Sequence, residues 1–361
     1  MAENKKLQDV VQVGRLLALL LAVFSVVTYL VTLILGPVLF FSTTEGLAEA
    51  ARHLQQLPVE VFMFIPLPPI HLGIDHGELF VGIWIVFLGC IVAAAFSRGG
   101  FFKSIRESLS TSISVAKTNF LYLMPIVATG LLSATILISE FQTTQGVQTG
   151  SLNYPPQTNP YYILLNLAYA PLDEEFAFRI TSIGIPIAII LLYSYRSDPR
   201  LAGITRQVGL FFLTLFSPEL AKSRLGHKTV AANGVIRGIS LPEWALIALT
   251  SVMFGFAHIL YGGGWEIGKV STAFLAGFVF AIMYVSYGAY ADILLHWFFN
   301  YYFTVLDMGS TAYGAAFTGF VNITYLVNLV GGGIVVFFFL IVWAFKLAEF
   351  LSLRATGSAQ I

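Results

Sequence analysis

Charged residues are scarce along this chain. Only 11% of its 361 residues are Asp, Glu, Lys or Arg, whereas 57% are hydrophobic. Soluble domains hold about 25% charged residues, and a soluble fold of this length cannot bury so much apolar surface. A lipid bilayer accommodates such a chain, since one membrane span needs roughly 20 mostly apolar residues. The composition therefore excludes an ordinary soluble domain and predicts a membrane protein.

Cysteine is almost absent. Cys90 is the only one, and it lies in an apolar run. This excludes a disulfide framework within the chain and any zinc site built on cysteines. The 19 basic residues balance 19 acidic ones, so the net charge of zero gives no sign of a nucleic-acid partner, and we expect none.

Long apolar runs are present instead, and they alternate with polar segments. In lipid, helices satisfy their own backbone hydrogen bonds, and the runs are too long for barrel strands. We expect eight spans: Leu16–Phe41, Leu79–Phe96, Asn119–Ser139, Tyr161–Tyr193, Leu241–Tyr261, Ser271–Tyr287, Ala289–Leu306 and Phe320–Phe345. The predicted fold class is an all-α polytopic membrane protein with about eight transmembrane helices, forming one integral membrane domain over residues 1–361.

Basic residues are concentrated on one side of these spans. Of the 19 Lys and Arg, 16 lie in four segments: 1–15, 97–118, 194–240 and 346–361. The intervening loops hold only Arg52 and Lys269. The positive-inside rule then predicts a multi-pass protein of the cell membrane with both termini in the cytoplasm.

The same rule makes 42–78 and 140–160 external loops, and 194–240 a basic cytoplasmic loop. Within that basic loop, residues 208–222 could lie on the membrane surface, or the whole loop could be solvated and only fix orientation. This orientation places His258 near the outer end of its span and Glu174 in the middle or outer half.

Four ionisable residues lie close together in the fourth span: Asp173, Glu174, Glu175 and Arg179. Inserting such a residue at the middle of a transmembrane helix costs roughly 2.5–3.5 kcal/mol, so the four together cost on the order of 10 kcal/mol. A cost of this size indicates that these residues have a function. Glu175 and Arg179 are four residues apart and can pair, whereas Glu174 points about 100° away. A salt-bridged kink beside Pro171 is the alternative, but it accounts for only one of the two glutamates.

Two histidines lie inside expected spans. His296 precedes Asn300 by one helical turn, so their side chains can reach one point, and His258 follows Phe254 by one turn. Asp292, one turn before His296, could orient the imidazole ring or simply reach the membrane interface. Together with the glutamates, these residues predict a polar cavity enclosed by the helices.

Three motifs appear in order along the chain. Residues 174–179 fit EExxxR, residues 254–258 fit FxxxH and residues 296–300 fit HxxxN. This pattern resembles the family of CAAX proteases and bacteriocin-processing enzymes (the CPBP or Abi family), which includes the Ras-converting type II CAAX prenyl endopeptidases. The resemblance covers a core region of about 120–306.

The resemblance implies an intramembrane glutamic-type endopeptidase that uses no cofactor and no metal. Its substrate would be a membrane-associated protein or peptide, possibly lipidated. By similarity, Glu174 activates water, His258 holds the same water, and His296 with Asn300 stabilises the oxyanion. Glu175 and Arg179 would fix the helix, and Phe254 would wall the cavity.

Two other functions fit part of the pattern. Glu174, His258 and His296 could bind zinc in a zinc-dependent intramembrane protease, although HExxH is absent and Asn300 would have no role. A transporter, or a non-catalytic scaffold or immunity protein, also fits buried charges. A transporter would more readily show inverted repeats, and the sequence shows none.

The metal alternative gives a first prediction. Proteolytic activity of the purified protein should survive a strong chelator, because a glutamate base needs no metal. The measurement is cleavage before and after chelation, together with the zinc content of the protein. Activity that falls on chelation and returns with zinc would replace the glutamate mechanism.

Overall fold

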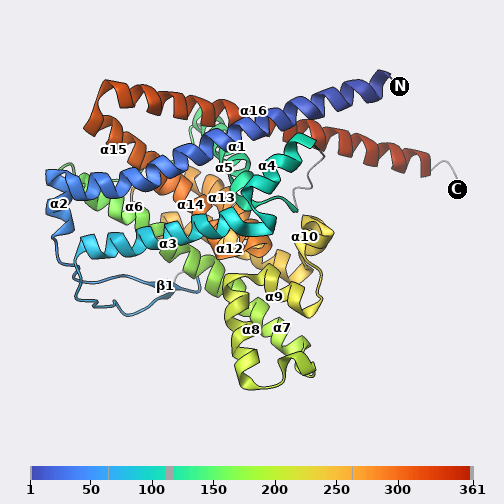
Figure 1. Cartoon of the computed structure of the whole chain (residues 1–361), viewed down its shortest axis with the longest axis horizontal. Helices are drawn as coiled ribbons and strands as arrows, with labels where there is room; N and C mark the ends of the chain where they lie inside the picture. The colour runs from blue at the N-terminus through green and yellow to red at the C-terminus, as the bar shows by residue number, and fades with distance from the viewer. Residues whose placement is uncertain (1, 64, 111–116, 262, 358–361) are drawn as a thin grey trace.

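Long helices running nearly side by side make up most of the molecule (Figure 1). The structure is a computed structural model that describes residues 2–63, 65–110, 117–261 and 263–357. Its longer helices are α1 (Ala2–Ser42), α3 (His76–Phe96), α5 (Phe120–Thr144), α6 (Pro160–Glu175), α12 (Leu241–Leu260), α13 (Gly268–Tyr287) and α16 (Ala315–Gly357). The predicted all-α membrane fold is therefore confirmed.

Seven helical segments of the described chain are long and apolar enough to cross a membrane: Gln12–Ser42, His76–Gly99, Phe120–Thr144, Pro160–Ser194, Leu241–Leu260, Gly268–Tyr287 and Ala315–Ala344. They correspond to seven of the eight expected spans. The remaining one, 289–306, is helical as well, through α14 (Ala289–Trp297), the π-helix η5 (Phe298–Tyr302) and α15 (Phe303–Tyr313). Its polar residues Asp292, His296 and Asn300 explain why it is less apolar than the other seven.

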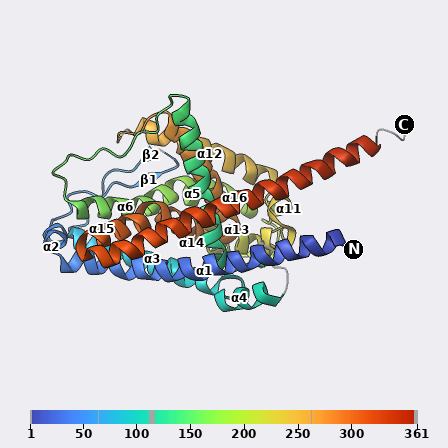
Figure 2. The same ribbon diagram turned by 90° about the horizontal axis from the view of Figure 1, so that it is seen from above.

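Helix α14 lies in the middle of the bundle. It packs against α3, α5, α6 and α13, and both ribbon views place it among these helices (Figures 1 and 2). Leu294, Leu295 and Trp297 are completely buried on different sides of it. A helix buried all round can carry polar groups that a lipid-facing helix cannot, provided that the neighbouring helices supply their partners.

The fourth span changes its helical type halfway. Helix α6 passes at Glu175 into the π-helix η3 (Phe176–Gly184), and α7 (Ile185–Ser194) completes the span. In a π-helix each N–H bonds five residues back, which widens the turn; such turns are frequent at functional sites. The widening follows the double glutamate directly.

The loop after α2 (Thr44–Ala50) turns back along the fourth span. It contains the antiparallel strands β1 (Glu60–Val61) and β2 (Ile65–Pro66). Met63 N donates to Ala177 O (3.1 Å), and Phe62 N donates to Thr181 Oγ1 (3.1 Å). We call residues 58–63 and 65–66 the hairpin; the segment drawn as β1 lies beside the α6–η3 helix in Figure 1.

The segment 194–240 is folded. It forms η4 (Pro199–Leu201), α8 (Ile204–Phe216), α9 (Pro218–Leu225), α10 (Val230–Asn233) and α11 (Val235–Gly238). Helix α8 packs on α7 and η3 and exposes Val208, Phe212 and Phe216 on its other side. The short helices η1 (Ser97–Gly99) and α4 (Phe101–Ser110) lie, like α9 and α10, toward the end of the molecule where α1 begins and α16 ends (Figures 1 and 2).

A buried ion pair attaches this segment to the bundle. Lys222 Nζ donates to Glu243 Oε1 (2.8 Å) and to Gly238 O (3.0 Å), and both charged side chains are at most 5% exposed. Glu243 also caps α12 by accepting from Ser240 N. The pair therefore joins α9 to the first turn of the fifth span.

We predict that Lys222→Met destabilises the protein by roughly 3–5 kcal/mol, because it leaves Glu243 buried without its cation. The measurement is thermal unfolding in detergent, followed by tryptophan fluorescence. The double variant with Glu243→Gln, which keeps a capping oxygen but no charge, should recover part of the loss. Equal melting temperatures for Lys222→Met and the parent would contradict the prediction.

Candidate active site

The carboxylate of Glu175 lies at the centre of a buried polar cluster. Its Oε1 accepts from Arg179 Nη1 (3.0 Å) and from His296 Nδ1 (2.8 Å), and both Glu175 and Arg179 are completely buried. The structure thus contains the i,i+4 ion pair that the sequence spacing predicts. It also joins two of the motifs, because one glutamate of the first holds the histidine of the third.

The guanidinium of Arg179 ties this cluster to α13 and α12. Its Nη2 donates to Gly277 O (3.2 Å), and its Cζ lies 4.3 Å from the centroid of the Phe254 ring. A Cβ on Gly277 would come within 3.0 Å of both Phe254 and Arg179, so only glycine permits this close approach. The EExxxR and FxxxH motifs therefore meet through a cation stacked on an aromatic ring.

His296 is oriented by Glu175 and not by Asp292. Because Nδ1 faces the Glu175 carboxylate, Nε2 points to the other side, where it lies 3.2 Å from Asn300 Nδ2 and 3.8 Å from Glu174 Oε2. Asp292 is fully buried close to Glu175, so it does not reach the membrane interface either. Both alternatives considered for Asp292 were wrong, because Glu175 from the neighbouring span occupies the position beside the ring.

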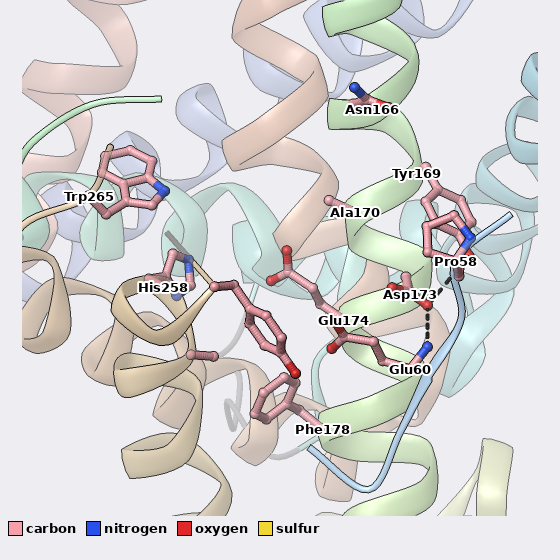
Figure 3. A pocket seen from close by; sticks show the side chains of 12 residues that line it. Pro58, Glu60, Asn166, Tyr169, Ala170, Asp173, Glu174, Phe178, His258 and Trp265 are labelled. Carbon is pink, nitrogen blue, oxygen red and sulfur yellow. Dashed lines mark hydrogen bonds between the residues drawn. The ribbon is translucent and has the colours of Figure 1, made fainter. Parts of the chain in front are cut away.

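The two adjacent glutamates have different surroundings. The Glu174 side chain is 30% exposed, whereas that of Glu175 is not exposed at all. Glu174 extends from the end of α6 into a cavity, toward α12 and His258 on the other side (Figure 3). This is the separation that the 100° helical offset predicts, with one carboxylate neutralised and its neighbour open to a cavity.

His258 faces that cavity with a defined ring orientation. Its Nδ1 donates to Phe254 O (2.9 Å), so in the neutral ring Nε2 carries the lone pair. The Phe254 ring centroid lies 5.0 Å from that of His258 and 6.0 Å from that of His296. Phe254 therefore packs against both imidazoles and lines a cavity with them, which is the position that the resemblance implies.

Two cavities meet at His258. The first, of about 300 Å³, lies between α6, α12 and the hairpin and is lined by Glu174, His258, Glu60 and Tyr261 among others (Figure 3). The second, of about 280 Å³, is lined by His258, His296, Asn300 and Lys269 among others. The four predicted catalytic residues thus line two adjoining cavities, and His258 contributes to both.

Several cavity residues were not found by sequence reasoning. Glu60 comes from the hairpin; its backbone N–H donates to Asp173 Oδ1 (3.0 Å). Tyr261 and Trp265 follow α12, and Lys269 lies in the first turn of α13, with Nζ 3.9 Å from the centroid of the Trp265 ring. Glu60 lies more than 100 residues from the glutamate motif, and no periodicity links the two. Lys269 was noted only for its charge.

The zinc alternative needs Glu174, His258 and His296 to lie around one ion. Among the residues that the structure describes, no group of three or more His, Cys, Asp or Glu side chains could hold a metal ion. Glu174 and His296 lie near each other, and His258 Nδ1 donates to a backbone carbonyl.

Glu60 introduces a titratable group at the cavity. Burial raises the pKa of its carboxyl from 4.5 to about 7, and the neighbouring carboxyls of Asp173 and Glu174 add to this rise. The folded state therefore favours protonated Glu60. This contribution to stability is complete below about pH 4.5 and is lost as the pH rises through about 7.

We predict that Glu60→Gln flattens this pH dependence, because glutamine keeps the shape and cannot ionise. The measurement is the melting temperature in detergent at about pH 5 and about pH 8, where the parent should lose more stability than Glu60→Gln. Glu266→Gln, at an exposed glutamate of a nearby loop, is the matched control. Parallel slopes for the parent and Glu60→Gln would show that the Glu60 carboxyl does not titrate in this way.

Comparison with known families agrees with the motif geometry. Residues 156–302 match the family described as Rce1-like, type II CAAX prenyl endopeptidase. The matched range contains all three motifs and the whole Glu175–Arg179–His296 cluster. The chain matches no curated protein and no solved structure significantly. The family match and the motifs within it support the assignment of this integral membrane protein to the CAAX protease family.

Proposed function

We propose that the protein is a glutamic-type intramembrane endopeptidase in which Glu174 is the general base. The observation that carries this proposal is the position of Glu174 and His258 on facing walls of one cavity, with His296 near Glu174 and Asn300 beside His296. Amide hydrolysis requires a general base, a second group that binds the attacking water, and donors for the oxyanion, all near a single point.

The proposed reaction begins with a water molecule between Glu174 and the Nε2 lone pair of His258. Glu174 takes a proton from this water as its oxygen attacks the scissile carbonyl carbon. The carbonyl oxygen becomes an oxyanion, and the protonated Glu174 then passes its proton to the leaving amine. Atoms and charges balance, since one water is consumed and a carboxylic acid and an amine are formed.

His296 and Asn300 are the proposed oxyanion donors. Their Nε2 and Nδ2 atoms lie 3.2 Å apart and so can serve one oxygen between them. In this role His296 Nε2 carries a hydrogen that it donates to the oxyanion, while Nδ1 is held by the Glu175 carboxylate. Preorganised donors of this kind are worth about 2.7–4 kcal/mol each in the transition state. Glu175 and Arg179 act here as positioning residues.

The substrate proposed is a membrane-associated protein or peptide that reaches the cavity from the bilayer or its surface. The proposed location is the cell membrane with both termini in the cytoplasm, which follows from the distribution of the basic segments. The reaction as proposed uses only side chains and water, and it involves neither a cofactor nor nucleic acid.

The test compares three single variants. Glu174→Gln should lower cleavage by about 10²–10⁴-fold, the range of a general base, with little change in melting temperature because Glu174 is partly exposed. Glu175→Gln and Arg179→Ala should each lower the melting temperature, because each leaves the partner side chain buried without a counter-charge. The expected loss in the free energy of unfolding is roughly 3–5 kcal/mol. Their double variant should be less than additive.

The activity readout is a map of new peptide termini in the membrane proteome, compared between cells with wild-type and with Glu174→Gln protein. The same map identifies the substrate. A stable Glu174→Gln protein that leaves every terminus unchanged would sink the proposal. Loss of cleavage in a stable Glu175→Gln protein, with normal cleavage by Glu174→Gln, would reverse the two glutamate roles.

A further inference from the structure

The two ends of the helix bundle differ in charge. The described residues of the basic segments, 97–110, 117–118 and 194–240, lie toward one end, where α1 begins and α16 ends (Figures 1 and 2). The loops at the other end hold only two basic residues, Arg52 and Lys269, and we call it the base-poor end. Short cytoplasmic loops carry the excess of Lys and Arg, so the base-poor end faces away from the cytoplasm.

Residues from the base-poor end line both cavities. Pro58 and Glu60 of the hairpin, and Tyr261 and Trp265 after α12, line the first cavity. Glu140 and Thr149, near the turn after α5, line the second together with Lys269. Neither of these two cavities is lined by a residue of 97–118 or 194–240.

The hairpin adds a second, independent observation. Its backbone is not helical, yet Phe62 and Met63 bond to Thr181 and Ala177 in the middle of the span Pro160–Ser194. Non-helical backbone at this depth is tolerated only where it is buried in protein or lines a water-filled cavity. The hairpin departs from α2 and returns to α3 at the base-poor end, so water that solvates it comes from that end.

We infer that the catalytic cavity opens on the non-cytoplasmic side, and that the substrate is the outward-facing segment of a membrane-anchored protein. The identification of a substrate rests on the proposed function. The direction in which the cavity opens rests on charge and geometry alone. A prenylated cytoplasmic tail, the substrate that the family name suggests, would lie on the opposite side of the membrane. Water for hydrolysis and the peptide then arrive from the same side.

Accessibility of single cysteines tests the direction of opening without any need for activity. Cys90, the only native cysteine, is buried and is first replaced by alanine. Single cysteines are then placed at the exposed positions Gln145 and Glu266 of the base-poor end. Lys103 and Lys228 are the matched exposed positions of the basic end. The probe is a positively charged, membrane-impermeant methanethiosulfonate applied to intact cells.

We expect cysteines at 145 and 266 to be labelled in intact cells, and those at 103 and 228 to be labelled only after permeabilisation. Ala170→Cys, which lies on the wall of the first cavity, should also be labelled in intact cells. Asn166→Cys on the same wall replaces it if the Ala170 variant does not fold. Labelling of 103 and 228 in intact cells, or cavity cysteines that react only after permeabilisation, would overturn the inference.

The termini experiment separates this inference from the proposed function. Glu174-dependent cleavage sites should map to outward-facing segments of membrane-anchored proteins. Sites in cytoplasmic segments would overturn the inference and still support a protease. An unchanged set of termini would remove the proposed function, and the cysteine labelling would still decide which side the cavity faces.

Discussion

The bonds of one buried carboxylate set the geometry of the site. Glu175 binds Arg179 on its own span and His296 on α14, and Arg179 in turn binds the backbone of α13 at Gly277. Removing two charges from water costs several kcal/mol per ion, and only close, well-aligned donors offset that penalty. The three helices are therefore held in one relative arrangement, and the orientation of the His296 ring and the location of Asn300 both follow from it.

A second constraint is that backbone groups within a membrane must find partners. The π-helix η3 leaves the carbonyl of Ala177 able to accept several bonds: Thr181 Oγ1, Ser182 Oγ and Met63 N all donate to it. The hairpin is thus attached to the helix at the point where the α-helical pattern stops. This attachment brings Glu60 to the wall of the cavity, opposite the helix that carries His258.

The sequence predicted those parts of the protein that follow from helical periodicity. The spans, the Glu175–Arg179 pair and the different directions of Glu174 and Glu175 depend only on apolar length and on 3.6 residues per turn. The bond from Glu175 to His296 joins residues 121 positions apart, so no local pattern announces it. The hairpin escaped prediction for a related reason, since its partners Asp173, Ala177 and Thr181 lie on a distant span. The roles of the site residues remain predictions.

The proposed oxyanion donors restrict the conformation of whatever is cut beside them. In an α-helix each peptide carbonyl accepts a hydrogen bond from the N–H four residues further along the chain. Under the proposed mechanism the scissile carbonyl turns instead to His296 and Asn300, whose side-chain nitrogens lie 3.2 Å apart. A coiled segment would therefore have to uncoil at the scissile bond first. Glycine, proline or β-branched residues there lower the free energy of that uncoiling. Under this mechanism, selectivity would depend on how readily a segment loses its helical form, as well as on the side chains it presents.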